Sequence, residues 1–134
     1  MPTGSCMYGE IQYEYIGEPA LTALCHCRDY QKWSGSGETS NVVVPRSAFK
    51  ITKGNPKVFV RMGGSGQEHL HFFCGNCGSS LYSQPVSMPD VTIIKTGGLN
   101  GGAADIPIAV EFYTKDRQSF CIPIEGAQQA QTMS

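Results

Sequence analysis

The segment Phe73-Cys74-Gly75-Asn76-Cys77-Gly78-Ser79 decides how the rest of this chain is interpreted. Two thiolates two residues apart on a tight turn hold one edge of a tetrahedron, which is the geometry of a zinc knuckle. The other clustered cysteines are Cys6 and the pair in Cys25-His26-Cys27. Cys121 stands alone in an apolar stretch, so we interpret it as a small buried hydrophobe. The cysteine pattern therefore predicts a zinc site.

Length and composition limit the class of protein. A chain of 134 residues suffices for one hydrophobic core, so we expect one domain at 1–125 and a polar, frayed tail at 126–134. A net charge of -1 gives no basic surface for nucleic acid, and a small-molecule partner fits better. No segment reads as a membrane span or signal peptide. We therefore expect a cytoplasmic protein, in which clustered cysteines bind metal more often than they form disulfides. The oligomeric state does not follow from the sequence.

The spacing of glycine and proline predicts a mainly β, single-domain fold with at most short helices. Sixteen glycines and eight prolines interrupt the chain too often for long helices, while short β-rich runs recur. In the first of these runs Ile11, Tyr13 and Tyr15 alternate onto one face. A short helix is predicted over 28–33, before a Ser/Gly-rich breaker. The predicted strands are 9–15, 20–25, 41–44, 49–53, 57–61, 68–73, 80–83, 91–96 and 108–113.

Three cysteine motifs follow one another along the chain. They read Gly4-Ser5-Cys6-Met7-Tyr8-Gly9, then Cys25-His26-Cys27-Arg28-Asp29-Tyr30-Gln31-Lys32-Trp33-Ser34-Gly35, then Phe73-Cys74-Gly75-Asn76-Cys77-Gly78-Ser79. In order and separation they resemble the glutathione-dependent formaldehyde-activating enzyme (GFA) family, which shares the centromere-protein-V/GFA domain. The late segment from Val110 to Arg117 also looks like the family's C-terminal strand. The resemblance covers nearly the whole chain.

The resemblance implies a β-tent fold with zinc-bound knuckles and two zinc sites. The structural site is implied to use Cys6, Cys74 and Cys77, and Tyr8 stands at the family's remaining cysteine position. A neutral phenol is a poor zinc ligand beside thiolates, so we expect Tyr8 to pack against the site. Either a thiolate from the middle motif joins these three cysteines, or water is the fourth ligand. We favour the first, because structural zinc contributes folding free energy that a small β domain needs.

The second zinc site is implied to use the middle motif. Its ligands are Cys25 and Cys27, and Tyr30 stands at the position of the third thiolate. His26 does not complete this site easily, because neighbouring side chains in an extended segment point to opposite faces. Two thiolates alone hold a metal weakly, so we expect one structural zinc per chain and a second zinc that is absent or weakly held.

Two residues are candidate catalytic groups. Tyr30 acts either as a general acid or hydrogen-bond donor in the pocket, or as a core aromatic that fills the vacated metal position. His26 is a candidate proton carrier, with His69 and His71 as weaker ones; solvated surface histidines are the alternative. Trp33 is expected to anchor the short helix to the sheet.

Charged residues beside the middle motif are candidates for substrate binding. Arg28 and Lys32 flank the pocket motif and could hold carboxylates such as those of a glutathionyl group. For Arg28 the alternative is a solvated helix face. Asp29, Lys95 and Glu111 are weaker candidates that rest on position alone.

Three functions remain open from the sequence. The resemblance implies a carbon–sulfur lyase-like enzyme that adds a thiol such as glutathione to a small carbonyl compound, or releases it from the adduct. The first alternative is a metabolite enzyme without a second zinc, which uses Tyr30 and His26 for acid–base chemistry. The second alternative is a non-catalytic, zinc-stabilised binding module.

Overall fold

The computed structural model describes residues 1–133 and consists mainly of β-strands. Its α-helix α1 spans Arg28–Ser34, and the 3-10 turns are η1 Arg46–Ala48, η2 Thr96–Gly98 and η3 Thr114–Asp116. This confirms the prediction of a mainly β fold with at most short helices. Within the described residues, no helix has the length and hydropathy of a membrane span. The strands are β1 Thr3–Ser5, β2 Gln12–Tyr15, β3 Leu21–Cys25, β4 Thr39–Pro45, β5 Phe49–Lys53, β6 Lys57–Met62, β7 Glu68–Phe73, β8 Ser80–Pro85, β9 Val91–Lys95, β10 Val110–Phe112 and β11 Gln128–Gln129.

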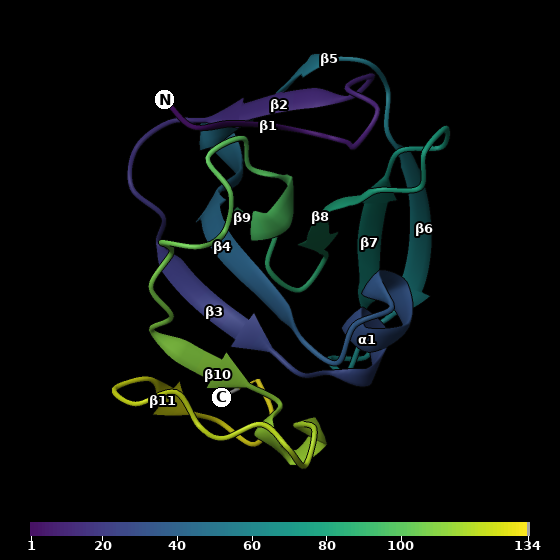
Figure 1. Ribbon diagram of the computed structural model, residues 1–134. Coiled ribbons are helices and arrows are strands. Elements are labelled where there is room, and N and C mark those ends of the chain that lie inside the picture. Colours follow the sequence, from purple (N-terminus) through teal and green to yellow (C-terminus); the bar gives the residue numbers. More distant parts are fainter. Residues whose placement is uncertain (134) are drawn as a thin grey trace.

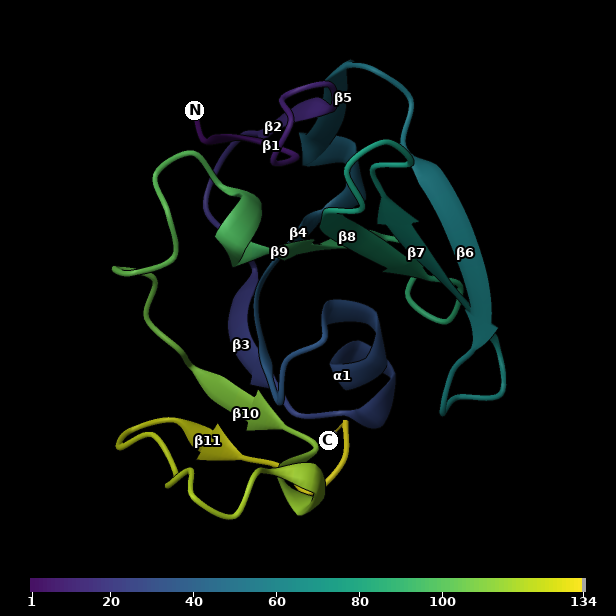
Figure 2. The same ribbon diagram turned by 45° about the vertical axis from the view of Figure 1, so that its right-hand side comes forward.

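The strands form two sheets. The large sheet has the order β11-β10-β3-β4-β9-β8-β7-β6, and the small sheet has the order β1-β2-β5. Neighbours in the large sheet are antiparallel from β3 to β6, whereas β10 runs parallel to both β3 and β11. The small sheet lies on one side of the large sheet and α1 on the other (Figure 1, Figure 2). One face of the large sheet is therefore directed toward the small sheet, and the other face toward α1.

The face toward the small sheet forms the hydrophobic core. Successive side chains on a strand point to opposite faces, so Val42 and Val44 of β4 share this face. They belong to one buried cluster with Ile94 of β9. Tyr13 and Ile11 from the N-terminal segment complete it and are each 1% exposed. The sequence placed Ile11 on the same face as Tyr13, and their common burial confirms that reading.

The opposite face carries polar and thiol groups. The register aligns Ala23, Asn41 and Lys95 across β3, β4 and β9. Cys25 lies two residues along β3 from Ala23, and therefore points to the same face. Helix α1 begins three residues after Cys25 and lies over this side of the sheet (Figure 2). Because side chains alternate between the two faces of the sheet, the apolar core lies on one face and the polar and thiol groups lie on the other.

Strand boundaries differ from the prediction mainly at turns. The predicted strand 9–15 begins only at Gln12, because Gly9 adopts a φ of 86° and donates its N–H to the carbonyl of Cys6 at 3.0 Å. Glycine tolerates this left-handed backbone without steric cost. The ranges 49–53 and 68–73 are confirmed residue for residue.

The C-terminal segment differs from the frayed tail that its composition predicted. Residues 126–133 lie within the described part of the chain, and Gln128–Gln129 forms β11 against β10. The side-chain amide of Gln129 donates to Glu111 Oε2 at 2.8 Å, and Ala130 is 6% exposed. A polar strand forms here because β10 offers it a free edge, a tertiary effect that local composition does not show. Ser134 lies outside the described residues.

Candidate metal centre and candidate active site

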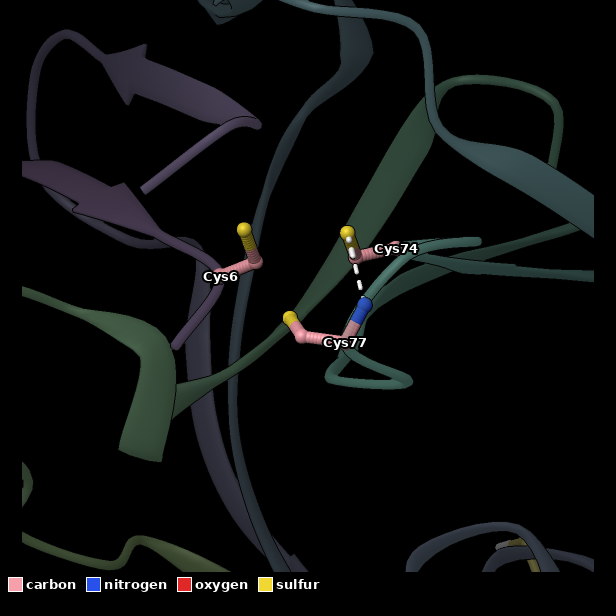
Figure 3. Close-up of side chains that lie close together, drawn as sticks. All are labelled: Cys6, Cys74 and Cys77. Atoms are coloured by element: carbon pink, nitrogen blue, oxygen red, sulfur yellow. Dashed lines mark hydrogen bonds between the residues drawn. The ribbon is translucent and has the colours of Figure 1, made fainter. Parts of the chain in front are cut away.

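Three thiols from two loops form a candidate metal centre. The sulfur atoms of Cys6, Cys74 and Cys77 all lie within 4.8 Å of one another (Figure 3). Cys6 follows β1, and the other two lie in the loop between β7 and β8. Sulfur atoms bound to one tetrahedral zinc at about 2.3 Å are separated by about 3.8 Å, so the cluster fits this ion. All six cysteines are free thiols.

The local backbone explains why these thiols converge. The N–H groups of Asn76 and Cys77 lie 3.4 and 3.5 Å from Cys74 Sγ, and Gly78 closes the knuckle with a φ of 79°. On the other loop, the Ile11 N–H donates to Cys6 Sγ at 3.3 Å. Hydrogen bonds from Ser79 lower the pKa of Cys77 to about 6. The knuckle therefore favours the thiolate form of Cys77, which is the form that binds metal.

The two positions expected to complete this cluster lie elsewhere. Tyr8 is 71% exposed, so the prediction that it packs against the site is wrong. The turn from Cys6 to Gly9 directs the intervening side chains into solvent. Cys25 and Cys27 are not part of the three-cysteine group and instead line a separate cavity. The structure thus does not bring a middle-motif thiol to the metal centre.

Cys25 and Cys27 open into a cavity of about 790 Å³. Cys25 ends β3, and Cys27 is the N-cap of α1, where its sulfur accepts the N–H of Tyr30 at 3.5 Å. Hydrogen bonding with Cys25 lowers the pKa of Cys27 to about 7, and the Tyr30 N–H and nearby Lys95 act in the same direction. None of the metal-centre cysteines lines this cavity.

Tyr30 forms part of the cavity wall and is 5% exposed. Its hydroxyl shares a 2.6 Å hydrogen bond with Ser83, and its ring makes edge contacts with His69 and His71. Burial raises the pKa of Tyr30, so the phenol is neutral. Trp33 lies beside it, with ring centroids 5.9 Å apart. The phenol therefore sits in an aromatic layer between α1 and the sheet.

Lys95 is buried behind the cavity wall that Tyr30 forms. The sequence named it only as a weak candidate, on the basis of its position in the chain. Its Nζ lies 3.3 Å from the centroid of the Tyr30 ring and donates to Asn41 Oδ1 at 2.5 Å. Burial lowers the pKa of Lys95 to about 7, and the nearby thiols of Cys25 and Cys27 oppose this shift. The burial of Lys95 follows from the strand register that pairs it with Asn41, and this register is not visible in the sequence.

These residues do not fit the second zinc that the middle motif implied. Two thiols remain, but the Tyr30 hydroxyl is held by Ser83, and the Lys95 amine lies against the phenol ring. A cationic amine beside Cys25 and Cys27 disfavours a divalent cation there by like-charge repulsion. The cavity chemistry therefore depends on the side chains themselves.

His26 lies outside the cavity wall, although it is completely buried. Its Nε2 lies 2.8 Å from Glu111 Oε1. Burial alone would raise the pKa of Glu111, but hydrogen bonds from Ile124 N–H, Gln129 and His26 lower it to about 2. The pair joins the start of the middle motif to the C-terminal segment. This geometry indicates that His26 has a structural role and does not transfer protons in the cavity.

The candidate substrate-binding residues separate onto two surfaces. Arg28 lines the large cavity and donates to Gln31 Oε1 at 2.5 Å. Lys32 borders a different hollow of about 180 Å³, together with Asp29 and Arg61. Arg61 donates to Asp29 at 2.8 Å. Only Arg28 of the two candidates is thus placed to meet a ligand in the large cavity.

Comparison with known proteins adds a family and a fold. Residues 1–116 match the family described as glutathione-dependent formaldehyde-activating enzyme. A crystal structure of a Rhodobacter sphaeroides protein, a structural genomics target, has a TM-score of 0.59 and 19% sequence identity. The match covers 76% of this chain and 91% of that chain, and it shows a shared fold. No curated protein matches.

Proposed function

Since this chain belongs to the glutathione-dependent formaldehyde-activating enzyme family, we propose that it is an enzyme of carbon–sulfur bond chemistry. Its reaction joins a thiol of the glutathione type to a small carbonyl compound, or releases the thiol from such an adduct. The substrate is a small molecule that binds in the large cavity. The observation that carries this proposal is that Cys25 and Cys27 open into that cavity.

The size and lining of the cavity suit such an adduct. A volume of about 790 Å³ lies within the range of about 300–1,000 Å³ typical of small-molecule sites. Arg28 and Lys115 at its border are cations for the carboxylates of a glutathionyl group, while Ala23, Val43 and Ile93 form an apolar floor. A thiol–carbonyl adduct therefore meets charged groups at the rim and thiols at the base.

Zinc at the Cys6, Cys74 and Cys77 cluster has a structural role in this proposal. Zinc there would supply folding free energy by clamping two loops together. Cys6 and Cys74 belong to the core cluster on the other face of the sheet. The reacting molecule therefore does not contact this metal centre.

Cys27 is the proposed acid–base group. Its thiolate takes the proton of the incoming thiol, and the substrate sulfur attacks the carbonyl carbon. The carbon–sulfur bond forms as the carbonyl π bond becomes an oxyanion, to which the Cys27 thiol returns the proton. Release of the thiol is the same sequence in reverse. Lys95 acts through Cys27, because a nearby cation favours the thiolate form of that residue.

The two alternative functions from the sequence analysis have less support than this proposal. Acid–base chemistry by Tyr30 and His26 requires both groups at the substrate, yet His26 is bonded to Glu111 outside the cavity wall. The Tyr30 hydroxyl is engaged with Ser83. A non-catalytic module would not need Lys95 buried behind two thiols, an arrangement that costs folding free energy.

The test is turnover of S-hydroxymethylglutathione by the parent protein and by Cys27→Ser. Serine keeps the N-cap of α1, so this variant removes the thiol and retains the helix start. We expect kcat/KM to fall about 100-fold or more, the scale of acid–base catalysis. Cys121→Ser, a change in a loop outside the cavity, is the matched control and should stay within twofold. Equal activity of Cys27→Ser and the parent would refute the assignment.

A further inference from the structure

The metal centre has three thiols, and a closed structural zinc site has four ligands. Tyr8, at the position where the motif lacks its cysteine, is 71% exposed and turned away. The middle-motif thiols line the cavity on the other face of the sheet. The fourth ligand is therefore either water or a protein group that the cysteine motifs do not include.

Glu10 is placed at this corner. Its Oε2 lies 3.7 Å from Cys74 Sγ. In a tetrahedral site with Zn–S near 2.3 Å and Zn–O near 2.0 Å, the sulfur–oxygen edge is about 3.5 Å. The observed separation is close to that edge. We propose that the carboxylate of Glu10 is the fourth zinc ligand, an inference that rests on the proposed zinc at Cys6, Cys74 and Cys77.

The backbone around Glu10 is held in position for this role. The Cys6 N–H donates to the Ile11 carbonyl at 3.0 Å, which closes the loop that contains Glu10. On its other side, a Cβ at Gly54 would lie 2.5 Å from the Glu10 carbonyl oxygen, so the two segments are in close contact. Loop closure and this contact fix the backbone from which the carboxylate extends.

Only the side chain has to move when the ion binds. The carboxylate does not lie within 4.8 Å of all three sulfur atoms, so it must turn further toward Cys6 and Cys77. Glu10 is exposed, so its side chain extends into solvent rather than into the core. Ordering this exposed side chain costs rotamer entropy, which the bond to the ion has to offset.

The surroundings offset the negative charge of this ligand set. Three thiolates and one carboxylate around Zn²⁺ carry a formal charge of about -2. The N–H groups of Ile11, Asn76 and Cys77 point at the sulfur atoms of Cys6 and Cys74. Such hydrogen bonds to charged acceptors are stronger than neutral ones.

Lys57 adds a cation beside the knuckle. A Cβ at Gly75 would lie 2.7 Å from Lys57 Cδ, so the lysine stem packs against the knuckle backbone. This lysine is exposed and keeps its ammonium group in solvent next to the site. A ligand set with excess negative charge therefore has a nearby counter-charge.

The experiment measures zinc affinity by chelator competition for the parent, Glu10→Gln and Glu18→Gln. Glu18 is an exposed carboxylate on the loop after β2 and is the matched control. Loss of even an outer-shell partner costs about 10–100-fold in metal affinity, so Glu10→Gln should lose at least that much. Glu18→Gln should stay within twofold. Circular dichroism at saturating zinc checks that each variant is folded.

A second measurement uses the Co²⁺-substituted proteins. Replacing the carboxylate changes the ligand field, so the visible absorption of Glu10→Gln should shift relative to the parent and to Glu18→Gln. Unchanged zinc affinity and an unchanged Co²⁺ spectrum in Glu10→Gln would overturn the proposal while leaving the three-cysteine site intact. Failure of the parent itself to bind zinc would instead refute the metal centre of the proposed function.

Discussion

Replacement of Lys95 by methionine should make the protein more stable and less active. Lys95 is 7% exposed, and its ammonium donates to Asn41 Oδ1 and lies over the rings of Tyr30 and Trp33, with no carboxylate paired to it among the ion pairs of the described residues. Methionine has a similar length and an unbranched stem, so it fills the same space without a charge. The variant therefore separates the cost of the buried cation from the packing of its stem.

The size of the effect follows from proton linkage. Burial lowers the pKa of Lys95 from 10.5 to about 7 in the folded protein. Between these values the unfolded chain binds more protons at this position than the folded chain, so the stability of the parent rises with pH. Below pH 7 the full penalty applies, which at 1.36 kcal/mol per pH unit is roughly 5 kcal/mol. Above pH 10.5 the penalty disappears.

Lys95→Met removes the penalty and also leaves Asn41 Oδ1 without its donor, which costs about 1–3 kcal/mol at every pH. The pH-independent part cancels when two pH values are compared. The gain of the variant over the parent should therefore be about 3 kcal/mol larger at pH 6 than at pH 9.5. For a domain of this size this corresponds to a difference of about 12 °C in Tm.

Thermal melts of zinc-saturated parent and variant at the two pH values provide the assay. Lys50→Met, an exposed lysine on β5, is the control and should show no comparable pH dependence. Turnover of S-hydroxymethylglutathione by Lys95→Met should fall about tenfold or more, because the cation that favours the Cys27 thiolate is gone. A gain that does not change with pH, or full activity of the variant, would refute the reasoning.

Two further changes test the metal centre and the cavity wall. Cys77→Ser should lose zinc and most soluble protein, since an open knuckle forfeits the metal's contribution to folding, whereas Cys121→Ser should melt within a few degrees of the parent; a similar Tm for both would contradict the structural role. Tyr30→Phe leaves the fully buried Ser83 hydroxyl without its partner, so Tm should drop by about 4–8 °C, while kcat should change less than tenfold; a hundredfold loss would instead assign acid–base catalysis to the phenol.

The sequence predicted the parts of the fold that depend on local chemistry. The knuckle at Cys74 and Cys77 follows from two thiols on a glycine turn, and Cys6 lies beside them as the family resemblance implied. Strands with clear alternation, such as Phe49–Lys53, were found at their true bounds. By contrast, Gln128–Gln129 has no apolar pattern and forms a strand only because β10 is available beside it. Such pairing is decided by distant residues.

The sequence named candidate residues for the site but did not give their arrangement in space. The motif order identified Cys25 and Cys27 as a pair, but their separation from the metal centre depends on the face of the sheet to which each strand directs them. The pairing of β9 with β4 positions Lys95 beside Asn41. The turn that contains Glu10 lies close to the knuckle in space, although the two are far apart in the sequence. Register and loop direction are long-range properties, and a motif does not contain them. The wrong placement of Tyr8 has the same cause.

The two faces of the large sheet explain how the cavity can vary while the three-cysteine cluster stays in place. On β4, Val42 and Val44 belong to the core with Cys6 and Cys74, whereas Asn41 lies on the cavity face. Because the side-chain period of a strand is two, a substitution at an alternate position alters one layer and leaves the other packed. A buried lysine behind two thiols is thus compatible with an intact core. The chemistry of the cavity is therefore free to change at positions such as Tyr30 while the fold stays the same.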